Sequence, residues 1–120
     1  MIQNYITRSQ NEKSIKIRSA GNSLFIKKKH ERNDHELIWE LYTLSIAIAE
    51  IDSEELACGY ANRSAILKHF GKYKECMKDI DNALKITTSN ALRVKLLCRK
   101  SRCSLILQND KQRNFLEKKL

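Results

Sequence analysis

The sequence predicts an all-helical domain built from stacked helix pairs. Proline is absent from the 120 residues and only three glycines are present, so the chain has few residues that interrupt helices. Apolar side chains recur at three- and four-residue steps in successive segments, which is the spacing of a buried helical stripe. Because a chain of this length holds one core, we expect a single domain over residues 1–120.

The stripes and the residues between them predict where each helix begins and ends. Ser53 is a typical N-cap followed by two acids, and Gly71 can adopt the left-handed backbone that ends a helix. Asn33 or Asp34 can cap a helix after a solvated turn near residues 30–35. The predicted helices cover residues 12–28, 37–49, 54–70, 73–86, 91–107 and, as a short sixth helix, part of 110–120.

Three segments of the chain match the spacing of the tetratricopeptide repeat (TPR), a helix pair of about 34 residues. The clearest repeat spans about 54–88, the first about 12–50 with an enlarged turn, and a partial third about 90–120. Arg63 and Thr88 replace the usual leucine and proline, so the match depends on spacing and side-chain size. We therefore expect a TPR-like right-handed superhelix of antiparallel helix pairs, about two and a half repeats long.

The chain from about Lys16 to Leu107, and most specifically the run from Ala57 to Leu84, also resembles the repeat region of the SET- and MYND-domain lysine methyltransferases. The resemblance implies that the full-length protein methylates protein lysines with S-adenosylmethionine as methyl donor. The family's zinc-binding cysteine and histidine cluster, its Asn-His-Ser-Cys run and its glycine-rich methyl-donor loop have no counterpart here. We therefore expect no catalysis, cofactor or metal site in this chain alone, and interpret it as the repeat segment of such a protein.

Five polar residues fall on the first helix of each repeat, which lines the concave face of a TPR stack. They resemble the carboxylate clamp of TPR co-chaperones, with arginine at the first place where lysine is usual. That resemblance implies binding of the acidic C-terminal tail of cytosolic heat-shock chaperones, whose carboxylates would be neutralised by the basic groups and hydrogen-bonded by the amides. The candidate peptide-binding residues are Arg18, Asn22, Asn62, Lys95 and Arg99.

The same five residues have a plainer interpretation. On a chain with 23 lysines and arginines, the three basic residues can be ordinary surface charges, and the two asparagines can bridge helices. In that case the repeats serve as a structural segment that docks on the SET and MYND domains of its own protein. Leu97, Leu105 and Leu107, which the incomplete third repeat leaves uncovered, favour such docking.

Charge and composition limit the other functions. The net charge of +9 favours an acidic partner, but the aromatic residues sit at core spacing, which argues against nucleic-acid binding. No apolar run is long enough for a membrane span, so we expect a cytoplasmic location, with Lys27 to Lys29 as a weak nuclear-import signal. The cysteines lie in apolar helical stretches without metal-ligand spacing, which predicts buried free thiols at positions 58, 76, 98 and 103.

Overall fold

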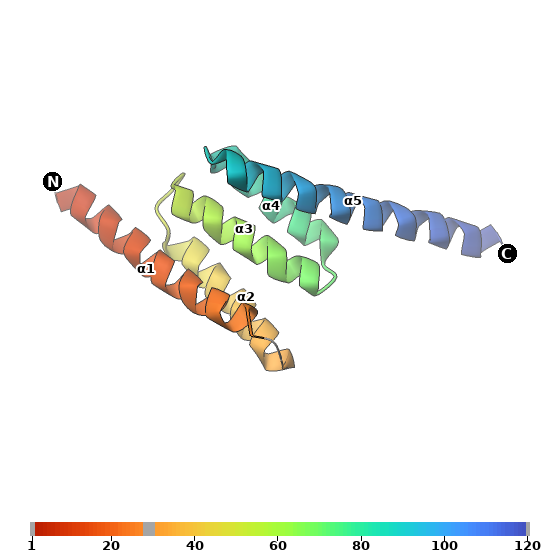
Figure 1. Ribbon diagram of the computed structural model, residues 1–120, viewed down its shortest axis with the longest axis horizontal. Helices are drawn as coiled ribbons and strands as arrows, with labels where there is room; N and C mark the ends of the chain where they lie inside the picture. Colours follow the sequence, from red (N-terminus) through yellow and green to blue (C-terminus); the bar gives the residue numbers. More distant parts are fainter. Residues whose placement is uncertain (1, 28–30, 120) are drawn as a thin grey trace.

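A computed structural model describes residues 2–27 and 31–119 of the chain. It is all-helical over these residues, and the helices follow one another in two packed layers, with α1, α3 and α5 in front of α2 and α4 (Figure 1). The helices are α1 (Ile2–Phe25), α2 (Arg32–Ile48), α3 (Glu54–His69), α4 (Tyr73–Ile86) and α5 (Asn90–Lys119). The predicted TPR-like arrangement of packed helix pairs is confirmed, with α1/α2 and α3/α4 as pairs and α5 stacked against the second pair.

The predicted ends of α3 are confirmed by the local backbone. The Ser53 hydroxyl accepts a hydrogen bond from the Leu56 N–H at 3.2 Å, which satisfies one of the amides left unpaired at a helix start. Gly71 has a φ of +78°, in the left-handed region, and its N–H donates to the Lys68 carbonyl. The predicted break between α4 and α5 is also confirmed, since α4 ends at Ile86 and α5 begins at Asn90.

Three helix boundaries differ from the prediction. The helix α2 begins at Arg32 instead of Leu37, because Glu31 is its N-cap and the Glu31 N–H donates to the Asp34 carboxylate at 3.1 Å. The helix α1 starts ten residues earlier than Glu12, at Ile2. The predicted sixth helix is wrong, because α5 continues without a break to Lys119. Residues 28–30, which hold part of the expected turn and of the lysine run, lie outside the described residues.

The core consists of two clusters that meet on α3. In the larger cluster, α3 and α4 pack against α5, which joins the second repeat to the extra helix. In the smaller cluster, Ile38 and Tyr42 of α2 pack on Ile66 of α3 and are 0% and 2% exposed. The buried residues of the larger cluster are Ala61, Leu67, Cys76, Ile80, Ala83, Leu96 and Cys103.

The cysteines are free thiols in different surroundings. Cys76 and Cys103 are buried with their sulfurs 3.6 Å apart, and burial raises the pKa of Cys76 to about 12, so this thiol stays protonated at neutral pH. Cys58 is half-buried, and burial raises its pKa as well. The prediction of burial is wrong for Cys98, which is exposed because it faces away from the α4 side of α5.

Arg63 connects the two helices of the second repeat to each other and to the first repeat. The Arg63 guanidinium donates through Nε and Nη2 to the two carboxylate oxygens of Asp79, at 2.8 Å and 2.9 Å. The third contact is made by Arg63 Nη1, which donates to the Thr43 hydroxyl on α2 at 3.3 Å. The Asp79 side chain is only 5% exposed and lies against the positive charge of Arg63, and the bidentate bond raises the pKa of Arg63.

Gly21 marks the closest approach of α1 to α2. A Cβ at this position would lie 2.7 Å from the Tyr42 ring, which is buried and cannot easily move. We expect Gly21→Ala to lower the free energy of unfolding by about 1–3 kcal/mol, because overpacking outweighs the higher helix propensity of alanine. Urea unfolding measures this, with Ser19→Ala on the exposed face of α1 as a near-neutral control. An unchanged or higher stability of Gly21→Ala would contradict the packing.

Removal of Arg63 tests the ion pair. We expect Arg63→Met to lower the free energy of unfolding by about 3 kcal/mol, because it leaves the Asp79 carboxylate buried without its cation. The double variant Arg63→Met/Asp79→Leu should recover most of that loss, since an apolar pair of similar volume leaves no buried charge. Chemical denaturation of the wild type, the single variant and the double variant measures their free energies of unfolding. A double variant as unstable as Arg63→Met would contradict this account of the ion pair.

Candidate functional site

The five predicted peptide-binding residues come from the three helices of one layer. Arg18 and Asn22 belong to α1, Asn62 to α3, and Lys95 and Arg99 to α5. Figure 1 shows these helices in the nearer layer, with α3 between the other two. The contacts of each side chain show how closely the three helices are joined.

Arg18 reaches from α1 to the first turn of α3. Its Nη1 donates a hydrogen bond to the Glu55 carbonyl oxygen at 3.2 Å, and the side chain is half-buried. Burial raises the pKa of the nearby Tyr42 hydroxyl to about 12, and the positive charge of Arg18 counters part of that increase. A guanidinium carries five N–H donors, so the bond to α3 leaves others available.

Asn22 and Asn62 are in direct contact. The Asn62 side-chain amide donates to Asn22 Oδ1 at 3.1 Å, and the Tyr42 hydroxyl donates to the same oxygen at 2.6 Å. The sequence predicts both asparagines on one face but gives no sign that Tyr42, which lies 20 positions from Asn22 along the chain, contacts them. These two bonds use only the Asn22 oxygen, so they leave the N–H donors of its amide available.

Arg99 connects α5 to α3 beside Asn62. Its Nη1 donates to the Ala61 carbonyl oxygen at 3.0 Å and to the Ser64 hydroxyl at 2.8 Å. Burial lowers the pKa of Arg99, but a guanidinium stays protonated at neutral pH. Lys95, one turn earlier on α5, is exposed. The structure therefore brings Asn22 and Asn62 together and attaches Arg18 and Arg99 to the same helix, α3, while Lys95 extends from the neighbouring α5.

Glu54 fixes the start of α5, and with it the place of Lys95 and Arg99. Its carboxylate accepts hydrogen bonds from the hydroxyls of Thr87 and Thr88, at 2.8 Å and 3.0 Å, and from the Thr88 N–H. These bonds lower the pKa of Glu54, the backbone bond most of all. The sequence indicated Glu54 only as a first-turn acid, because a contact across 33 residues leaves no local pattern.

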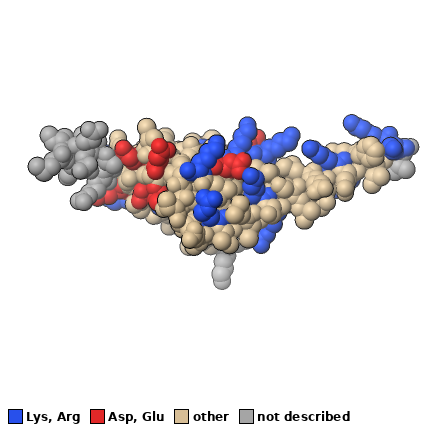
Figure 2. All heavy atoms as spheres, turned by 90° about the horizontal axis from the view of Figure 1, so that it is seen from above, with Lys and Arg blue, Asp and Glu red and all other residues tan. Residues whose placement is uncertain are grey.

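Charge is unevenly distributed over the molecule. In the view from above, lysines and arginines gather over the middle and toward the C-terminal end, and acidic residues lie mainly toward the N-terminal half (Figure 2). Within the described residues, no group of three or more His, Cys, Asp or Glu side chains is placed to hold a metal ion. None of the helices in the described part of the chain has the length and apolar character that crossing a membrane requires.

The fold and these contacts define a TPR-like helical repeat segment with a polar face on α1, α3 and α5. No protein-family model matches the chain. Over 97 residues, or 73% of the chain, it is 32% identical to protein-lysine N-methyltransferase SMYD4 of Pongo abelii. The identity to the protein of the same name is 31% over 82% of the chain in Mus musculus and 28% over 92% in Homo sapiens.

The chain belongs to the SMYD4 family of protein-lysine N-methyltransferases. It spans only 12% to 14% of the length of these three relatives. This family is a SET- and MYND-domain family of the kind that the repeat sequence resembles. The described residues thus correspond to a helical segment of a much longer kind of protein.

The Glu54 contacts predict a pH dependence of stability. Because the folded-state pKa of Glu54 lies below its ordinary value of 4.5, its contribution to stability is present above that pH and is lost as the pH falls through the lowered pKa. We expect the stability difference between wild type and Glu54→Gln to shrink between about pH 6 and pH 3. Urea titrations at each pH measure it, with exposed Glu117→Gln as control. A difference that stays constant with pH would contradict the assignment.

Proposed function

We propose that this chain is the peptide-binding TPR segment of a SMYD4-type methyltransferase and binds the acidic C-terminal tail of a heat-shock chaperone. The ligand lies across α1, α3 and α5. Lys95 and Arg99 neutralise its carboxylates from one side and Arg18 from the other, and the amides of Asn22 and Asn62 hydrogen-bond between them. The whole protein is the enzyme, transferring a methyl group from S-adenosylmethionine to protein lysines with domains outside the described helices.

The observation that carries this proposal is the direct Asn22–Asn62 contact between α1 and α3, with Arg99 attached to α3 one residue away at Ala61. It sets two amides beside a guanidinium on one face. Hydrogen bonds between charged groups contribute about 1.5–3 kcal/mol each, so several such bonds would give the roughly 8 kcal/mol of a micromolar complex after ordering costs. The internal bonds of Arg18 and Arg99 reduce the freedom of these side chains, so little more is lost when a peptide orders them.

A second candidate function rests on the exposed apolar side chains of α5. Val94, Leu97 and Leu105 are 62%, 48% and 58% exposed on the face turned away from the repeat stack. Such a face fits docking against the SET and MYND domains of the same protein, with the segment acting as a structural support. The two functions differ in whether the isolated chain binds an acidic peptide. Nucleic-acid binding remains a weaker third candidate, supported only by the net charge of +9.

Peptide titration tests the clamp. We expect the chain to bind an acidic peptide that ends in a free aspartate, and Lys95→Ala/Arg99→Ala to weaken that binding at least about tenfold, since two charge-assisted bonds are lost. The variant Lys74→Ala/Lys78→Ala removes the same charge from exposed positions on α4 and should bind like wild type. Isothermal titration calorimetry measures both.

Two further measurements separate loss of binding from loss of fold. Lys95 is exposed and holds no helix together, so Lys95→Ala alone should weaken binding while leaving the helical circular dichroism unchanged. A peptide with an amidated C-terminus should bind more weakly than one with a free carboxylate. If the acidic peptide does not bind, or binds equally to the α4 and α5 variants, the clamp is wrong and docking on the protein's own domains is favoured.

A further inference from the structure

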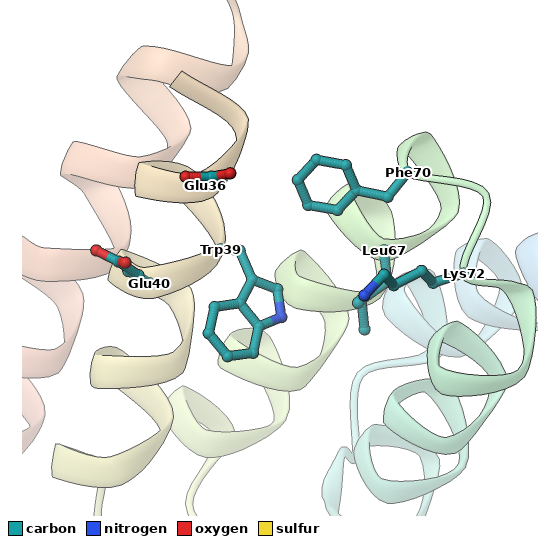
Figure 3. A pocket seen from close by; sticks show the side chains of 6 residues that line it. All are labelled: Glu36, Trp39, Glu40, Leu67, Phe70 and Lys72. Atoms are coloured by element: carbon teal, nitrogen blue, oxygen red, sulfur yellow. The ribbon is translucent and has the colours of Figure 1, made fainter. Parts of the chain in front are cut away.

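A pocket of about 540 Å³ lies outside the proposed clamp, between α2 and the connection from α3 to α4 (Figure 3). None of the five clamp residues lines it. Its lining combines one aliphatic and two aromatic side chains with two acids and one lysine, which makes it chemically unlike the basic and amide-rich face of α1, α3 and α5. The lining residues are Glu36, Trp39, Glu40, Leu67, Phe70 and Lys72.

The aromatic side chains form an open, partly exposed surface. Trp39 from α2 and Phe70 at the end of α3 enter the pocket from opposite walls (Figure 3), and each is 37% exposed. Leu67 also lines the pocket and is nearly buried. The His35 ring meets Phe70 edge-on with 5.6 Å between ring centroids, which holds that ring against α2. Both aromatic side chains are therefore partly accessible in the pocket.

The acidic and the basic side chains of the pocket lie on opposite walls. Glu36 and Glu40 lie one helical turn apart on α2 and flank Trp39 in sequence, whereas Lys72 extends from the opposite wall (Figure 3). On a chain with a net charge of +9, the carboxylates of Glu36 and Glu40 give the α2 wall of the pocket a local negative charge that can attract a cation. Lys72 carries the same sign as such a ligand, so it confines the cation to the α2 wall.

We propose that this pocket binds an arginine side chain from a basic segment of a partner protein. The guanidinium stacks its face on the Trp39 indole, where the ring quadrupole attracts a cation, and its N–H groups donate to the carboxylates of Glu36 and Glu40. Arginine fits better than lysine because its planar fork can stack and pair with a carboxylate at once. The aliphatic part of the side chain lies against Leu67 and Phe70.

The net positive charge of the chain opposes the approach of a basic partner only at long range. At physiological ionic strength the Debye length is about 8 Å, so charges on the far side of the molecule are largely screened. Binding therefore depends on the side chains in the pocket. Because Lys72 is the cation in contact with the site, its removal should strengthen binding.

Trp39 makes the pocket directly observable, because it is the single tryptophan of the chain. The probe is a capped Gly-Arg-Gly-Arg-Gly peptide titrated against the 120-residue chain at physiological salt, with Trp39 fluorescence as the readout. We expect a saturable change in emission. The same peptide with citrulline, a neutral isostere of arginine, should give none, and the peptide with lysine should bind more weakly.

Matched variants separate the pocket from general charge. Glu36→Gln/Glu40→Gln should weaken binding of the arginine peptide at least about tenfold, since both charge-assisted bonds are lost. The control Glu12→Gln/Glu117→Gln removes the same charge at exposed positions on α1 and α5 and should bind like wild type. Lys72→Ala should bind more tightly than wild type.

The proposal is overturned by any of three results. These are no saturable change of Trp39 emission with the arginine peptide, equal binding by the two double variants, and equal response to arginine and citrulline. Equal affinity for lysine and arginine peptides would overturn the choice of arginine. All variants change exposed polar side chains, and their helical circular dichroism should match wild type. The acidic peptide used to test the clamp should leave Trp39 emission unchanged. The proposals for the two sites can therefore be confirmed or contradicted independently.

Discussion

Arg63 holds the two helices of the second repeat together through Asp79 and joins them to the first repeat through Thr43. Arg63 spans three helices, because its guanidinium binds the nearly buried Asp79 carboxylate on α4 and the Thr43 hydroxyl on α2. A buried carboxylate allows few alternative packings, since any shift that separates it from its cation leaves an unpaired charge away from water. The packing of α3 between α2 and α4, and therefore the position of everything attached to α3, depends on Arg63 and its two partners.

Both candidate sites use α3 as their common support, but from different sides. Asn62 and the carbonyls of Glu55 and Ala61 connect α3 to α1 and α5 on the face proposed to bind an acidic tail. The end of the same helix supplies Leu67 and Phe70 to the pocket proposed for arginine. One rigid helix thus separates two surfaces of opposite charge preference, which would let a methyltransferase of this family engage two partner segments at once.

Much of the fold could be predicted because its signals are local. Apolar spacing, the Ser53 cap and the Gly71 left-handed turn each arise within one turn of helix, and the structure confirms them. The predictions failed where the local signal was ambiguous. Asn33 and Asp34 are good caps, but Glu31 caps α2 through Asp34. The polar segment after Leu107 lacks an apolar stripe, yet without proline or glycine nothing in it ends α5.

The sequence by itself determined that the chain is a stack of helix pairs and which polar residues occupy the first helix of each repeat, because both follow from periodicity along the chain. Only the tertiary structure decided what those residues touch. The Asn22–Asn62–Tyr42 hydrogen bonds, the Glu54 link to Thr87 and Thr88, and the pocket around Trp39 join residues 20 or more positions apart. Such contacts depend on how helices pack against one another, and helix periodicity fixes the face a residue occupies without fixing the partner across it.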